Sequence, residues 1–252
     1  MAKLSIIKLL ALIFLTVAGT SVIGQDRSAS LKVLFIGNSL TYANDVPGMI
    51  EALAKASRQR RFEHESITLP DHSLEDHWNK GNALKKIQKG KWDFVVMQQG
   101  PSAGKEGREV LLKYGKLFGD EIKKKGATPA MYMVWPAAGR AQDFPGVSET
   151  YLSGARAVGG LFLPVGEAWL SALRIDREII LYSQDGFHPS VVGSYLAALV
   201  IFEKMYGQTP IGLPSKLSLR SGTKVDIPAN DAEILQRAAK ETNERFGPAL
   251  KN

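Results

Sequence analysis

Short apolar runs alternate along this chain with segments whose apolar residues recur at helical spacing. The first run, residues 33–36, ends in Gly37-Asn38, a pair that favours a turn. A helical pattern then opens at Val46-Pro47, where the proline suits a first helical turn. The other predicted strands are 62–69, 94–97, 130–135 and 161–165, and the other predicted helices are 82–88, 106–124, 148–158 and 190–206.

This alternation predicts the fold class. Strands separated by helices favour a parallel sheet covered on both faces, and right-handed crossovers then make a three-layer α/β/α sandwich the economical arrangement. No internal repeat or second domain interrupts residues 25–252, so one domain is expected. Beyond Gly207 the pattern changes to a short hairpin, 217–219 with 225–227, and a last helix, 230–246. We expect this C-terminal part, about 208–252, to be an appendage on the domain.

The first residues have the layout of a secretory signal peptide. Lys3 and Lys8 precede the apolar run 9–17, and small residues lead to Gly24. This run is too short to span a membrane, and no stop-transfer pattern follows it. The sequence therefore predicts that 1–24 are cleaved and that the mature protein is secreted or periplasmic, with no stable membrane insertion. The chain has no cysteine, so no disulfide can contribute to its stability.

The charge of the chain argues against a nucleic-acid partner. The sequence has 32 Lys and Arg residues against 25 Asp and Glu residues, a net charge of +7. Apart from short runs such as 123–125, the basic residues are scattered and no aromatic residues interleave with them. The charge thus allows only a mild attraction to acidic polymers.

Two stretches carry candidate chemistry. Ser39 follows the first predicted strand directly, at the edge of a parallel sheet where ligands bind. Far along the chain, Asp185 lies three residues before His188, near enough for its carboxylate to hold the imidazole Nδ1–H. The free Nε2 could then accept the proton of a serine hydroxyl and turn it into a nucleophile. Each stretch alone also fits a simpler role, because serine and aspartate often cap turns.

Together the two stretches resemble the SGNH hydrolases, also called the GDSL esterase/lipase superfamily. The resemblance rests on Gly-Asn-Ser-Leu-Thr, 37–41, and on Asp-Gly-Phe-His-Pro, 185–189, and it spans roughly 32–206. It implies a flavodoxin-like fold with five parallel strands. It also implies that Ser39 is the nucleophile, His188 the general base and then acid, and Asp185 the residue that orients the imidazole.

The resemblance further implies an oxyanion hole, although the middle blocks differ from the family pattern. A backbone N–H normally comes from a glycine, and the loop at 70–74 offers Asp71 in its place. The family's asparagine amide is replaced by Gln98-Gln99, of which alternate strand facing allows only one to enter the site. We predict the backbone N–H groups of Ser39 and Asp71 and the Gln98 amide as the donors, with Gln99 as the alternative. Some SGNH branches that act on carbohydrates also end this strand in glutamine.

Other patterns compete with this interpretation. Residues 100–104 fit Gly-x-Ser-x-Gly, the nucleophile elbow of α/β-hydrolases, which would make Ser102 the nucleophile. Lys105 to Gly107 delay the helix that such an elbow requires, so this alternative is the weaker one.

Histidines and tryptophans near the same edge allow further interpretations. His72 and His77, beside acidic residues, match no usual metal-ligand spacing, so we expect no metal and no cofactor. Trp78 could line the pocket wall, and Trp135 or Trp169 could stack on a sugar ring or belong to the core.

These features predict a secreted serine esterase that hydrolyses small acyl esters by an acyl-enzyme mechanism. The favoured acyl group is an acetyl group on a glycan. Its partner would be a small-molecule or glycan ester. A lipid or aryl esterase of the same fold is the enzymatic alternative. A carbohydrate-binding relative with a defective oxyanion hole is the non-catalytic one.

Overall fold

The computed structural model describes residues 29–247, so the predicted signal peptide, 1–24, lies outside the described residues. Its centre is a five-stranded sheet in which all paired strands are parallel. This confirms the predicted fold class. The strands, in the order in which they lie in the sheet, are β2 (Phe62–Thr68), β1 (Leu31–Gly37), β3 (Phe94–Met97), β4 (Thr128–Tyr132) and β5 (Leu161–Leu163).

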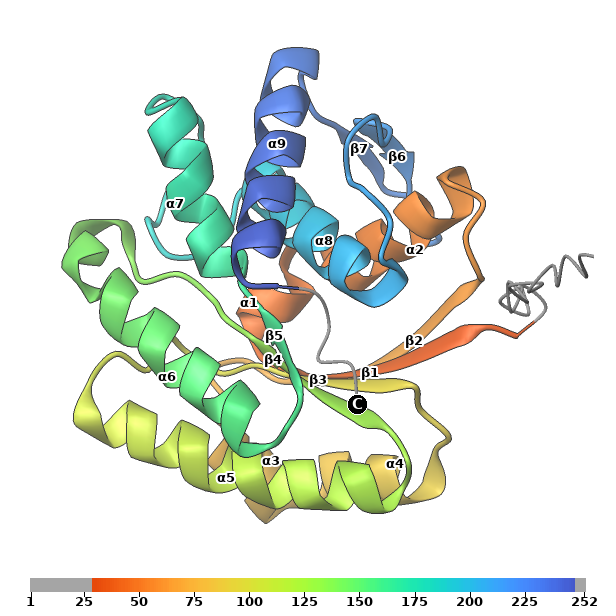
Figure 1. Ribbon diagram of the computed structural model, residues 1–252, viewed down its shortest axis with the longest axis vertical. Helices are drawn as coiled ribbons and strands as arrows, with labels where there is room; N and C mark the ends of the chain where they lie inside the picture. The colour runs from red at the N-terminus through yellow and green to blue at the C-terminus, as the bar shows by residue number, and fades with distance from the viewer. Residues whose placement is uncertain (1–28, 248–252) are drawn as a thin grey trace, which may run out of the picture.

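Helices cover both faces of the sheet (Figure 1). On one face lie α2 (Val46–Ala56), α7 (Val165–Ile175), α8 (Val191–Tyr206) and α9 (Ala229–Arg245). On the other lie α3 (Leu74–Lys80), α4 (Asn82–Lys89), α5 (Lys105–Lys124) and α6 (Phe144–Ala157). The short α1 (Ser39–Tyr42) and two 3₁₀ segments, η1 (Ala43–Asp45) and η2 (Ala138–Asp143), complete the main domain.

The strand order creates a switch point beside β1. β1 pairs with β2 on one side and with β3 on the other, so Val33 lies between His64 and Phe94. The connection from β1 to β2 runs over one face, and the connection from β2 to β3 runs over the other (Figure 1). In open α/β sheets the crevice at such a point, outside the carboxyl ends of the strands, is where ligands bind.

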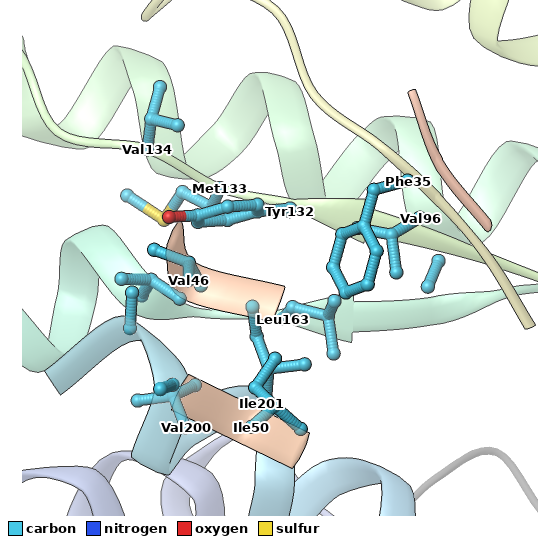
Figure 2. Close-up of a cluster of buried hydrophobic side chains, with 14 of the residues drawn as sticks. Phe35, Val46, Ile50, Val96, Tyr132, Met133, Val134, Leu163, Val200 and Ile201 are labelled. Atoms are coloured by element: carbon cyan, nitrogen blue, oxygen red, sulfur yellow. The ribbon is translucent and has the colours of Figure 1, made fainter. Parts of the chain in front are cut away.

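The core between the sheet and α2 and α8 is built from branched and aromatic side chains (Figure 2). Phe35 and Val96 of the sheet meet Ile50 of α2 and Ile201 of α8 in this layer, and all four are buried. Only Lys32 is exposed in β1, as expected for a parallel strand covered on both faces. The core therefore fixes β1, and with it the residue that follows its carboxyl end.

Several elements differ from the sequence prediction. β5 ends at Leu163 rather than at residue 165, and α6 begins at Phe144 rather than at residue 148. α3 begins at Leu74, inside the predicted loop, where Ser73 and Asp76 form a reciprocal capping box. α7 follows β5 directly and was not predicted as a helix. β4 ends at Tyr132 rather than at residue 135, because its neighbour β5 offers no pairing residue beyond Leu163.

The C-terminal segment forms the expected hairpin and helix. β6 (Lys216–Ser218) pairs antiparallel with β7 (Lys224–Asp226), and α9 follows. α9 packs against α7 and α8 and buries Leu235 and Ala238, so it completes one helical layer rather than extending from the domain. Among the residues described, no helix is both long and apolar enough to cross a membrane.

Candidate active site

Ser39 lies at the corner where β1 passes into α1. Asn38 caps this helix, since its Oδ1 accepts a hydrogen bond from the Leu40 N–H at 3.1 Å. Gly37 is required at the bend, because a Cβ there would come within 2.4 Å of the Gln98 Oε1 atom. As the first residue of the helix, Ser39 has a backbone N–H that precedes the first intrahelical hydrogen bond. The side chain of Ser39 and this N–H are thus held at the carboxyl edge of the sheet.

His188 lies on a tight loop that Asp185 organises. One carboxylate oxygen, Oδ1, accepts hydrogen bonds from the Ser183 hydroxyl at 2.8 Å and from the backbone N–H groups of Phe187 and His188, both at 2.9 Å. Gly186 supports the turn with a φ of 68°, a conformation that favours glycine. The loop is therefore ordered by the same carboxylate that faces the imidazole.

The three candidate residues meet at the carboxyl edge of the sheet. His188 Nδ1 lies 2.6 Å from Asp185 Oδ2, and His188 Nε2 lies 2.9 Å from Ser39 Oγ. Hydrogen bonding, first to His188 and then to the loop, holds the pKa of the Asp185 carboxyl well below its ordinary value. An ionised carboxylate can only accept, so Nδ1 carries the proton and Nε2 is left to accept from the serine hydroxyl. This arrangement can draw the proton from Ser39 as the oxygen attacks.

The loop after β2 brings Asp71 to the same corner. Asn38 Nδ2 donates to the backbone carbonyl of His72 at 3.1 Å, which ties this loop to the Ser39 turn. Asp71 has a φ of 56°, the left-handed conformation that glycine adopts most easily, in agreement with its predicted equivalence to a glycine. Within residues 29–247 the Asp71 N–H has no hydrogen-bond acceptor. It is therefore available as a donor, as is the Ser39 N–H.

Comparison with known proteins gives matches among solved structures only. No protein-family profile and no curated protein matches the chain. A protein from Slackia heliotrinireducens, described as a candidate SGNH hydrolase, is 28% identical with a TM-score of 0.61, over 70% of this chain and 100% of its own. The chain has the SGNH hydrolase fold. The predicted resemblance to the SGNH hydrolases is confirmed, and with it the prediction of a carboxylic ester hydrolase.

Two further structures share the fold at lower identity. A DUF4886 family protein from Bacteroides uniformis is 20% identical with a TM-score of 0.69, over 85% of this chain and 95% of its own. An acetyl-xylooligosaccharide esterase from Geobacillus is 14% identical with a TM-score of 0.57, over 72% of this chain and 96% of its own. At these identities the likeness shows the SGNH fold alone.

Gln98 does not occupy the place predicted for it in an SGNH oxyanion hole. Its Oε1 accepts from the Asn38 N–H at 2.9 Å and from the Thr41 hydroxyl at 2.8 Å, which fixes the orientation of the amide. Its Nε2 then donates both hydrogens, to Asn38 Oδ1 at 2.9 Å and to the Gln99 carbonyl at 2.6 Å. The prediction of a free Gln98 donor is wrong, because both N–H groups of this fully buried amide are already hydrogen-bonded. These hydrogen bonds connect the end of β3 to the turn at Ser39.

Gln99, the alternative donor, is also engaged. Its Oε1 accepts from the Leu74 N–H at 3.0 Å, and its Nε2 donates to Ser102 Oγ at 2.8 Å and to the Gly107 carbonyl at 3.1 Å. The two glutamines do point to opposite sides, as strand alternation requires. Neither presents an unused N–H toward Ser39.

Replacing Gln98 by alanine is expected to lower the free energy of unfolding by about 2–4 kcal/mol, since the Asn38 N–H and the Thr41 hydroxyl lose their acceptor in the interior. Urea denaturation followed by circular dichroism measures this. Gln88, exposed on α4, provides the matched control, for which Gln88→Ala should change the stability by less than about 0.5 kcal/mol. Equal stabilities for the two variants would show that the Gln98 network does not contribute.

Two of the tryptophans near the site, Trp135 and Trp169, belong to the hydrophobic core and do not line its surface. Trp135 and Trp169 stack with ring centroids 3.7 Å apart and planes 8° apart, and both are fully buried. Trp135 also donates its Nε1–H to the Phe187 carbonyl at 3.0 Å. Neither ring has a free face for a sugar, so the structure gives them the core role. Trp78, half-buried, packs edge-on against Phe118.

His72 and His77 lie side by side, and each is hydrogen-bonded to a backbone carbonyl. Their ring centroids are 5.3 Å apart, and His77 Nε2 lies 2.8 Å from the Gly37 carbonyl. Burial lowers the pKa of His77, so the neutral ring donates to that carbonyl. His72 Nδ1 lies 2.7 Å from the Pro70 carbonyl. Across the described part of the chain, no three His, Cys, Asp or Glu side chains gather as a metal site.

Among residues 29–247, no basic side chain is hydrogen-bonded to Ser102, the alternative nucleophile. Its hydroxyl donates to the Gly100 carbonyl at 2.8 Å and accepts from Gln99. The prediction that Lys105 to Gly107 delay the helix is wrong, because they form the first turn of α5. Residues 103–104 still separate Ser102 from this helix, so the direct strand–turn–helix geometry of an α/β-hydrolase elbow is absent at this serine.

Proposed function

We propose that this chain is a serine esterase that hydrolyses small acyl esters. The observation that carries the proposal is the hydrogen-bonded relay from Asp185 Oδ2 through His188 to Ser39 Oγ, with separations of 2.6 Å and 2.9 Å. A hydroxyl paired with an oriented imidazole at a sheet edge is the arrangement that acyl transfer needs.

In the proposed mechanism Ser39 Oγ attacks the ester carbonyl carbon while His188 Nε2 takes the hydroxyl proton. The carbonyl oxygen becomes an oxyanion, which the N–H groups of Ser39 and Asp71 stabilise. The tetrahedral intermediate collapses, and His188 returns the proton to the departing alcohol. Water then attacks the acyl-Ser39 ester by the same route and releases the carboxylic acid. Asp185 remains ionised throughout and stabilises the imidazolium.

Acetyl groups on a carbohydrate are the substrate we propose. Support comes from the predicted export of the chain and from the fold that it shares with an acetyl-xylooligosaccharide esterase and an acetyl xylan esterase. A secreted or periplasmic location would place the enzyme where acetylated glycans occur. We propose no nucleic-acid partner, because the basic residues form no binding pattern.

One observation favours a second candidate function. Because both Gln98 N–H groups are already donated, the oxyanion would have two backbone donors and lack the side-chain amide of the family pattern. An oxyanion hole with only two donors would stabilise the transition state less well, as expected for a carbohydrate-binding relative that no longer hydrolyses esters.

Hydrolysis assays separate these candidates. The proposed enzyme should hydrolyse p-nitrophenyl acetate and release acetate from acetylated xylan, with activity falling from acetate to octanoate esters. A fluorophosphonate should label Ser39, and peptide mass mapping should show no adduct on Ser102. Ser39→Ala is the negative control and Ser102→Ala the matched serine control. Binding of xylan without hydrolysis of any ester would favour the second candidate, and preference for octanoate would favour a lipid esterase.

A further inference from the structure

Asn44 has an unusual backbone for a residue with a side chain. It lies in η1, five residues after Ser39, with a φ of 55° and a ψ of 16°, and the next residue, Asp45, has a φ of 57°. Two consecutive non-glycine residues in the left-handed region are uncommon, and asparagine and aspartate tolerate that region best. A position held in this way calls for a physical reason.

Helix capping accounts for Asp45 but not for Asn44. Asp45 is the N-cap of α2, and its Oδ1 accepts from the Gly48 N–H at 3.0 Å. Asn44 makes no capping bond to α2. Its side chain points away from its own segment and toward the chain around His188.

The Asn44 amide joins two segments that are far apart in the sequence. Its Nδ2 donates to the Pro189 carbonyl at 3.0 Å and to the Ser194 hydroxyl, also at 3.0 Å. Pro189 directly follows His188, and Ser194 lies buried in the first turn of α8. Both amide hydrogens therefore connect the turn after the candidate nucleophile with the chain after the candidate base.

We propose that Asn44 is a positioning residue that sets the distance between Ser39 Oγ and His188 Nε2. This inference rests on the proposed function, since it deepens the role of the same site. The 2.9 Å hydrogen bond between these atoms joins residues that are 149 positions apart in the sequence. Asn44, five residues after Ser39, is hydrogen-bonded to Pro189, the residue after His188, and so ties the two segments together. Its left-handed backbone aims the amide at Pro189 and Ser194.

Asn44→Gly tests the side chain, because glycine adopts the left-handed backbone without strain and lacks the two donated hydrogen bonds. Arg58→Gly accounts for the backbone freedom that glycine adds. We expect kcat on p-nitrophenyl acetate to fall about 10- to 100-fold, the cost of a small displacement between reacting groups, with KM within about twofold of wild type. Ser194→Ala, which removes one acceptor and leaves Pro189, should give a smaller fall in kcat.

Arg58→Gly is the matched control. Arg58 also has a φ of 55°, but it follows the far end of α2, about 16 Å along that helix from Asp45. This variant should keep wild-type kcat. The positioning role is overturned if Asn44→Gly loses no more turnover than Arg58→Gly, or if the loss lies in KM.

Hydrogen exchange gives a readout that does not depend on activity. The Ser183 and Ser190 N–H groups donate within the His188 loop, to the His188 and Leu181 carbonyls, both at 2.8 Å. Asn44→Gly should speed exchange at these two amides, and Arg58→Gly should not. If wild type hydrolyses no ester, faster exchange still supports the tie between the segments, while the proposed function fails. Unchanged exchange together with unchanged kcat overturns the inference.

Discussion

Ser39→Ala, His188→Ala and the double variant are expected to lose the same amount of turnover, about 10⁴- to 10⁶-fold in kcat, because a nucleophile and its base act as one unit. Without Ser39 no acyl-enzyme forms, and without His188 the hydroxyl keeps its proton. Once either residue is missing, removing the second lowers kcat almost no further. Initial rates with p-nitrophenyl acetate at saturation measure the effect.

The control for these variants is Thr41→Val, which removes a buried hydroxyl two residues from Ser39 and leaves the relay intact. It should lower stability while folded protein retains most of its kcat. Losses from Ser39→Ala and His188→Ala that add in the double variant would mean that the two residues act separately, and the proposed mechanism would then be wrong.

Asp185→Asn is expected to lower kcat about 10³- to 10⁴-fold while the protein stays folded. Asparagine keeps Oδ1, the atom that accepts from Ser183, Phe187 and His188, so the loop retains its internal hydrogen bonds. The other atom changes from an acceptor to an N–H donor, so it can no longer accept a hydrogen bond from His188 Nδ1–H. The imidazole then shifts its proton to Nε2 and donates toward Ser39, the wrong direction for a general base.

Ser183→Ala is the matched control for Asp185→Asn. It removes one of the three hydrogen bonds to Oδ1 and leaves Oδ2 facing His188. A hydrogen bond to a carboxylate is worth about 1.5–3 kcal/mol, so the loop should lose stability, while kcat should remain within about threefold of wild type because the relay itself is unchanged. Activity of Asp185→Asn near wild type would make the carboxylate a structural element of the loop and nothing more. Crystal structures or thermal melting of the variants would show that both remain folded.

The sequence was most informative where burial on both faces requires an unbroken apolar run. The strand-length runs around Val33, Val95 and Met131 predicted a covered parallel sheet because such strands need apolar residues on both faces. The sequence also carries a signal for α3, in Ser73 and Asp76 at capping-box spacing, but the turn-forming residues at 70–73 favour a loop there. The approach of His188 to Ser39 was predicted only through the family resemblance.

Side-chain partners were less predictable than elements. Gln98 was assigned to the oxyanion hole from its place at a strand end, but its partners depend on where Asn38 and Thr41 lie after folding. A polar side chain buried at such a corner bonds to the nearest unpaired backbone groups, and these cannot be read from the local sequence. The same limit applied to α9, whose packing on α7 and α8 depends on the whole layer.

The separation of 149 positions between Ser39 and His188 has a consequence for refolding. The nucleophile follows the central strand near one end of the described chain, and the base precedes the buried helix α8 near the other. Closing so long a loop carries an entropic cost that must be met before the contact forms. No fragment of the chain that ends before residue 185 contains both groups. Recovered turnover therefore reports assembly of the whole sheet, whereas recovered helix content can precede it.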